Sequence, residues 1–181
     1  MKFNFLYILL IVVSFMGCKS PEARKPISVK TGSFIENSAE RNISLNKKEN
    51  ELIDQIIQND SLNDYISSNY GFYYYFNTKV DSTSYLPQFG DIINFNYNIK
   101  SINGETIYSK DEIKTQNYAM DKEEIFTGLR EGLKLLSEGE TATFIFPSQK
   151  AFGYYGDENK IGTNIPLICK VSVNKITKNQ Q

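Results

Sequence analysis

The chain of 181 residues contains no histidine, no tryptophan and only two cysteines. Without histidine it has no Ser-His-Asp or Cys-His relay and no imidazole ligand for a metal, and two cysteines are too few for a thiolate zinc site or a disulfide framework. It also lacks an excess of charge of one sign, since 20 Lys and Arg stand against 21 Asp and Glu. A nucleic-acid binder normally carries a basic excess. We therefore expect no metal or other cofactor and no nucleic-acid partner.

The first residues have the pattern of an export signal. A basic start precedes an apolar run over residues 3–15, which is shorter than the roughly 20 residues that a membrane-spanning helix needs. The sequence therefore predicts a signal peptide over residues 1–17 that is removed. The four residues Phe-Met-Gly-Cys that end at Cys18 resemble a bacterial lipoprotein box. That resemblance implies lipidation of Cys18 and a membrane anchor of more than one acyl chain; an ordinary secreted protein is the alternative.

Two segments follow before the pattern turns to β structure. Residues 18–44 mix charged and polar side chains with two prolines, which predicts a flexible tether or a passive leader. Residues 45–70 are predicted to form a helical extension. Asn46 with Glu49 is typical of a helix start, and apolar residues follow at helical spacing. A second short helix is predicted from Ser61 or Asp64.

The remaining chain, residues 71–177, has the pattern of one α+β domain with an antiparallel sheet. Aromatic runs, period-two alternation and the hairpin pair Asn103–Gly104 indicate β strands. The expected strands are residues 72–76, the segment from Gly90–Asp91 to about residue 100, the return through Ile107 and Tyr108, and residues 141–146 and 166–176. One helix is predicted over residues 121–136, in which Gly128 and Gly132 lie on one face and allow close approach to the sheet.

The order of these elements and of several short motifs is similar to the FKBP-type peptidyl-prolyl isomerases. The motifs are Gly90-Asp91 through Tyr97 to Asn103-Gly104, then Phe-Thr-Gly-Leu-Arg-Glu-Gly-Leu over residues 126–133, and Phe-Ile-Phe-Pro over residues 144–147 followed by Ala-Phe-Gly over residues 151–153. The resemblance covers residues 90–176. It implies an FKBP-like half-barrel, in which an antiparallel sheet wraps over one helix with an apolar pocket between them.

The resemblance also implies the residues of that pocket. The positions matched to catalysis are Tyr97, Phe126, Leu129 and Phe152, and those matched to substrate binding are Ile107, Tyr108, Ile125, Ile161 and Cys169. Most active members of the family carry Asp at Tyr108, Tyr at Phe152 and an aromatic residue at Cys169. Phe152 lacks a hydroxyl that donates one hydrogen bond, worth about 0.5 to 1.5 kcal/mol, so we expect turnover or binding about threefold to tenfold weaker. Cys169 is expected to be a small buried apolar residue.

Such a pocket needs no catalytic group in the usual sense. Rotation about an X-Pro bond faces a barrier of about 18 to 20 kcal/mol but makes and breaks no covalent bond. A dry apolar pocket disfavours the polar planar imide and holds the proline in a reactive geometry. The absence of histidine is therefore compatible with this activity.

The function expected from the sequence is a membrane-tethered prolyl isomerase. It would assist the folding of proline-containing polypeptides of the cell envelope, most naturally in the periplasm, as a monomer. The layout resembles the gliding-motility-associated isomerase lipoproteins of gliding bacteria, which implies clients in the motility and secretion apparatus. Two alternatives are a binding or chaperone module that holds proline segments without turnover, and a purely structural lipoprotein.

Overall fold

The computed structural model describes residues 31–80 and 84–179, with side chains from residue 35 onward. The chain divides into two compact units, residues 1–39 and 40–181, and all the packing reported below lies within the second. The predicted signal peptide and the lipidation site Cys18 lie outside the described residues.

Helix α2, at Thr31–Asn59, is longer than the sequence pattern predicted. We expected the helix to start at Asn46, but Asn46 lies inside α2. The helix continues through this point because residues 33–59 contain no glycine or proline, the two residues that most disfavour a helix interior. The Glu49 carboxylate was expected to cap the helix. It instead accepts hydrogen bonds from the Ser148 backbone N–H at 2.9 Å and the Ser148 hydroxyl at 2.6 Å.

The second predicted helix, from Ser61 or Asp64, is absent from this described stretch. The Asp60 carboxylate accepts hydrogen bonds from the Leu62 N–H, the Asn63 side chain and the Tyr65 hydroxyl, which closes a turn directly after α2. Local side-chain bonds of this kind compete with helix formation. The chain then forms the short strand β1, at Ile66–Ser67.

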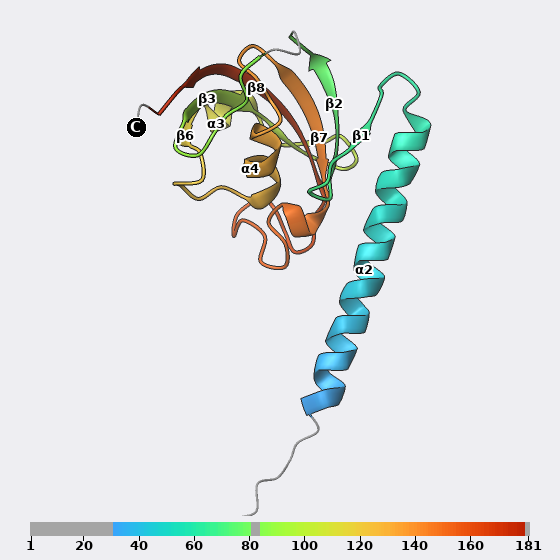
Figure 1. Cartoon of the computed structure of the whole chain (residues 1–181). Helices are drawn as coiled ribbons and strands as arrows, with labels where there is room; N and C mark the ends of the chain where they lie inside the picture. Colours follow the sequence, from blue (N-terminus) through green and yellow to red (C-terminus); the bar gives the residue numbers. More distant parts are fainter. Residues whose placement is uncertain (1–30, 81–83, 180–181) are drawn as a thin grey trace, which may run out of the picture. The chain divides into compact units, whose positions relative to one another are not determined.

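The strands form a single antiparallel sheet, as predicted. The remaining strands are β2 at Tyr73–Thr78, β3 at Ile92–Tyr97, β4 at Ile99–Ser101, β5 at Thr106–Tyr108, β6 at Gln116–Ala119, β7 at Thr141–Phe146 and β8 at Leu167–Thr177. Their order is β1-β2-β7-β8-β3-β6, with β4 paired to both β5 and β8. The long strand β8 therefore lies at the centre, and the sheet curves around helix α4 (Figure 1). This arrangement confirms the α+β fold class expected from the sequence.

Helix α4, at Thr127–Leu133, is shorter than the predicted helix over residues 121–136. Asp121 has a φ of 58°, and Phe126 is extended with ψ of 142° at the N-cap. The chain therefore enters the helix six residues later than the apolar spacing suggested. The structure also contains two short helices that the sequence pattern did not reveal, α3 at Lys110–Ile113 and the 3-10 helix η1 at Ser148–Lys150.

Two glycines let α4 lie close to the sheet, as predicted. A methyl group added at Gly128 would lie 2.6 Å from Phe146 Cδ1 and 2.7 Å from the Lys150 carbonyl oxygen, and one at Gly132 would lie 3.0 Å from Phe144 Cε1. Both distances at Gly128 are shorter than van der Waals contact. The helix thus rests directly on buried rings of β7, and this packing forms the floor of the core.

Candidate functional site

The nine pocket residues implied by the resemblance belong to one apolar cluster. Three of them are buried: Leu129 on α4, Cys169 on β8 and Ile161 in the loop before β8. The other six pack against the core while remaining partly exposed, namely Tyr97, Ile107, Tyr108, Ile125, Phe126 and Phe152. The cluster is therefore an apolar surface, partly open to solvent, above a closely packed floor.

Phe126 and Phe152 join the start of α4 to the loop after η1. Their ring centroids lie 5.1 Å apart, and the Phe126 ring also meets Phe146 of the core edge-on at 5.5 Å. Aromatic pairs at this separation are attractive beyond the area that they bury. The Phe126 backbone N–H bonds to no other residue that the structure describes, so it remains available as a donor at the edge of the cluster.

Tyr97 and Cys169 present neutral groups to the cluster. Burial raises the pKa of Tyr97 to about 12, so its phenol stays protonated near neutral pH. Within the described part of the chain the Tyr97 hydroxyl has no hydrogen-bond partner. Cys169 is a free, fully buried thiol whose pKa is raised by burial. It packs as a small apolar side chain, in line with the expectation from the sequence.

A carboxylate that the sequence analysis did not identify lies at the rim of the cluster. The Tyr108 hydroxyl donates a hydrogen bond to the Asp157 carboxylate. Asp157 Oδ1 also accepts from the backbone N–H of Ile161 at 2.7 Å and of Asn159 at 3.0 Å. The Lys160 ammonium lies 4.6 Å from the centre of the Tyr108 ring. These contacts tie the loop of residues 151–166, hereafter the site loop, to strand β5.

The electrostatics of this pair follow from its hydrogen bonds. Burial acts to raise the pKa of Asp157, but hydrogen bonds from the Tyr108 hydroxyl and from the Ile161 and Asn159 N–H groups outweigh burial and lower the pKa below its ordinary value of 3.8. The hydrogen bond to Asp157 raises the pKa of Tyr108. Near neutral pH the pair is therefore a phenol donating to a carboxylate. The one signal that pointed to it in the sequence was Tyr108 itself, at a position where the family carries an acid.

The start of the site loop is positioned by η1 and, through it, by helix α2. Ser148 is almost fully buried, and its carbonyl accepts hydrogen bonds from the Ala151 N–H at 3.0 Å and the Gly153 N–H at 2.8 Å. These bonds fix the backbone on either side of Phe152. Because Glu49 holds the Ser148 N–H and hydroxyl, α2 contacts the backbone that orients a predicted site residue.

Four cavities, with volumes of about 490, 440, 330 and 350 Å³, lie largely outside the apolar cluster. Of the nine predicted pocket residues, only Tyr97 lines one of these four. The predicted site is thus the partly exposed apolar surface itself, and the sequence expectation of a pocket between helix and sheet stays a prediction.

Comparisons with known proteins agree with the fold and with the motifs. The family model of FKBP-type peptidyl-prolyl cis-trans isomerases matches residues 84–174. The chain is 32% identical over 90 residues to a probable FKBP-type peptidyl-prolyl cis-trans isomerase, FkpA, of Neisseria meningitidis, covering 50% of this chain and 33% of that protein. The chain thus spans about a third of the length of this curated relative.

A solved structure shares the fold. The crystal structure of a peptidyl-prolyl cis-trans isomerase from Pseudomonas syringae superposes with a TM-score of 0.59 at 16% identity, and the match covers 75% of this chain and 95% of that one. The family model alone spans half of the sequence, and the motifs that we identified fall within it. The chain belongs to the FKBP-type peptidyl-prolyl cis-trans isomerase family.

Proposed function

We propose that the chain is a peptidyl-prolyl cis-trans isomerase that acts on proline-containing polypeptides at the apolar cluster. The observation that carries the proposal is the composition of that cluster. Six partly exposed side chains stand over Leu129, Ile161 and Cys169, and none of the nine carries a charge near neutral pH. Such a surface receives a prolyl ring and removes its water without offering a nucleophile or a metal.

The chemistry requires only that the surface bind the twisted imide better than the planar one. Twisting the X-Pro bond breaks amide resonance and makes the imide less polar, so an environment with little water favours the transition state over the ground state. The Tyr97 hydroxyl and the Phe126 N–H, both without partners among the described residues, supply donors for carbonyl groups of the bound peptide. Each 1.4 kcal/mol or so removed from the barrier increases the rate about tenfold.

Two departures from the family pattern set the expected level of activity. Phe152 has no hydroxyl, and the Tyr108 hydroxyl is already bonded to Asp157. Loss of one donor costs about 0.5 to 1.5 kcal/mol. We therefore expect slower turnover, by about threefold to tenfold, than from a site with tyrosine at position 152.

A protease-coupled assay on a peptide of the Ala-Leu-Pro-Phe type tests the proposal directly. The full chain should accelerate the cis-to-trans step. Phe126→Asp places a charge on the apolar surface and should abolish the acceleration. Leu62→Asp is a matched control, because Leu62 is 92% exposed and lies outside the cluster. Circular dichroism of each variant separates a lost site from a lost fold.

The second candidate function is a module that binds proline segments without turnover. It is favoured by the departures at Tyr108, Phe152 and Cys169 from the residues that most active members carry. An uncatalysed rate in the same assay, with peptide binding retained in calorimetry and lost in Phe126→Asp, would establish this function in place of the enzyme.

We further propose that the protein is a lipid-anchored envelope protein whose isomerase domain assists folding in the periplasm, with motility and secretion components among its clients. The supporting observations are the apolar start of the chain and the lipoprotein-like Cys18. None of the helices among the described residues is long and apolar enough to span a membrane. Labelled palmitate should be incorporated in cells and lost in Cys18→Ser; incorporation that survives this change contradicts the anchor.

A further inference from the structure

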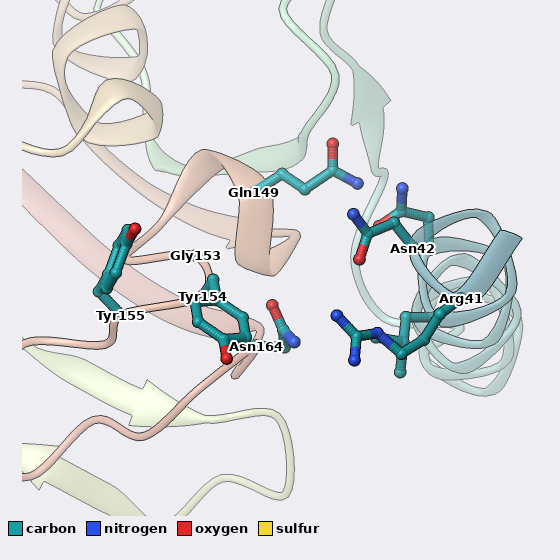
Figure 2. A pocket seen from close by; sticks show the side chains of 9 residues that line it. Arg41, Asn42, Gln149, Gly153, Tyr154, Tyr155 and Asn164 are labelled. Atoms are coloured by element: carbon teal, nitrogen blue, oxygen red, sulfur yellow. The ribbon is translucent and has the colours of Figure 1, made fainter. Parts of the chain in front are cut away.

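A groove lies between helix α2 and the site loop, beside the apolar cluster. Its volume is about 490 Å³, within the range of roughly 300 to 1,000 Å³ typical of ligand sites. Hereafter the α2 groove, it is lined by Arg41, Asn42, Leu45 and Asn46 of α2, by Gln149 of η1, and by Gly153, Tyr154, Tyr155 and Asn164 of the site loop. Figure 2 shows the side chains of Arg41 and Asn42 facing those of Gln149 and Asn164 across it.

The lining of the α2 groove is suited to an extended peptide. Four of its side chains are amides: Asn42, Asn46, Gln149 and Asn164. Each amide both donates and accepts hydrogen bonds, as the alternating N–H and C=O groups of a peptide backbone require. None of these four side chains bonds to another residue that the structure describes. Their bonding capacity is therefore available to a ligand, while Tyr154 and Leu45 supply apolar contact.

The lining of the groove also carries a positive charge. Arg41 is the one charged residue in its lining. The Arg41 guanidinium forms no ion pair within the described part of the chain. A guanidinium presents a fork of donors that matches a carboxylate. An acidic side chain is therefore the group that best complements this wall of the groove.

The site loop connects the groove to the proposed prolyl site. Phe152 belongs to the apolar cluster, and the next two residues, Gly153 and Tyr154, line the groove. Ile161 likewise belongs to the cluster, and Asn164 lines the groove three residues later. The Asn164 N–H donates to the Gly153 carbonyl at 2.8 Å, which joins the two arms of the loop. A polypeptide bound at the cluster therefore needs only a few residues to reach the groove.

The α2 wall of the groove is fixed to the domain. The two hydrogen bonds from Ser148 to Glu49 hold α2 beside η1, and Ile53, one helical turn further on, is fully buried. Arg41 lies two turns before Glu49 in the same helix. The backbone of this wall therefore belongs to the folded domain, while the side chains of Arg41 and Asn42 are exposed and open to a ligand.

We propose that the α2 groove is an extended subsite, which holds the client polypeptide a few residues from its proline and prefers an acidic side chain opposite Arg41. This inference rests on the proposed function, because the client reaches the groove from the prolyl site. It assigns the helical extension a role in selecting substrates, which the isomerase fold alone does not supply.

Fluorescent peptides test the proposal on the full chain. Each peptide has about 12 residues and is some 40 Å long when extended. Each carries one proline, with a glutamate or a lysine at a distance from the proline that increases stepwise through the set. Fluorescence anisotropy gives each dissociation constant. At one spacing the glutamate peptide should bind about threefold more tightly than its lysine counterpart, the size expected for an exposed ion pair. Arg41→Glu should reverse that preference.

Control variants keep the outcome decisive. Lys48→Glu makes the same charge change on an exposed residue of α2 that does not line the groove, so it should preserve the preference for glutamate. Gln149→Ala should weaken both peptides by a similar factor and leave their ratio unchanged. Equal binding of the two peptides at every spacing, or a preference that survives Arg41→Glu, overturns the proposal.

The same peptides separate this inference from the proposed function. If no peptide is isomerised but the glutamate preference still depends on Arg41, the groove is upheld and the enzyme is not. If tetrapeptides are isomerised and no spacing gives an Arg41-dependent preference, the enzyme is upheld and the groove is not.

Discussion

At the scale of single residues, two polar groups at the rim of the site are placed differently from the family pattern. Tyr108 stands where the family carries an acid, and Asp157 supplies a carboxylate from the opposite side of the rim, 49 positions further along the chain. The sequence could identify both Tyr108 and Phe152 as departures, because Phe152 lies inside a motif and Tyr108 follows the Asn103–Gly104 hairpin on the returning strand. It could not identify Asp157 as the partner of Tyr108, because no local pattern records a contact between segments so far apart.

The Tyr108–Asp157 hydrogen bond predicts a pH dependence. The pKa of Asp157 is lowered in the folded state, so its contribution to stability is complete above the unfolded value near 3.8 and is lost as the pH falls through the folded value. Wild type should therefore melt at a higher temperature than Asp157→Asn at pH 7, and the two should converge as the pH falls through the lowered pKa of Asp157. Tyr108→Phe should show the same trend with a smaller difference.

Calorimetric melting curves at stepped pH provide the measurement. A difference between wild type and Asp157→Asn that grows on acidification would show that the carboxylate is destabilising in the folded protein. That result would contradict the claim that the Tyr108–Asp157 hydrogen bond stabilises the contact between the site loop and β5.

At the scale of elements, the strands could be predicted from the sequence far better than the helices. β7 coincides with the predicted residues 141–146, because strong alternation and aromatic content act locally. Helix α4 begins only at Thr127. Asp121, where the helix was predicted to start, instead has a left-handed backbone conformation. Helix α2 begins before Asn46 because no glycine or proline interrupts residues 33–59, and Glu49, predicted to cap the helix, instead accepts hydrogen bonds from Ser148 of η1.

The contact of α2 with η1 predicts a stability effect. Glu49→Ala leaves the buried Ser148 N–H and hydroxyl without an acceptor, and each unsatisfied buried group costs about 1 to 3 kcal/mol. Urea unfolding should therefore show a free energy of unfolding that is lower by at least about 1 to 3 kcal/mol. Glu49→Gln retains one acceptor oxygen and should lose less.

The matched control lies in the same helix. Glu51→Ala removes only an exposed pair with Lys47, whose charged atoms are 3.9 Å apart, and should change stability by less than about 0.5 kcal/mol. Equal effects of Glu49→Ala and Glu51→Ala would mean that α2 is not held to the domain through Ser148.

At the scale of the whole molecule, the family and the α+β fold class could be predicted from the order of motifs and elements along the sequence. The nine pocket residues implied by the resemblance all belong to one apolar cluster, although they come from six separate elements or loops. The α2 groove had no such signal, because Arg41 and Asn164 are brought to one cavity by packing between segments far apart in the chain. Local periodicity predicts the strands, and the family resemblance predicts the pocket residues, but neither predicts a surface between the helical extension and the rest of the domain.

Exchange spectroscopy by NMR on a proline peptide, with and without the full chain, measures whether the apolar cluster catalyses isomerisation. A small fraction of protein should accelerate cis–trans exchange at the X-Pro bond, and peptide binding should shift the resonances of Phe126 and Phe152. Exchange that stays at the uncatalysed rate, with those two ring signals unmoved at saturating peptide, would contradict this prediction.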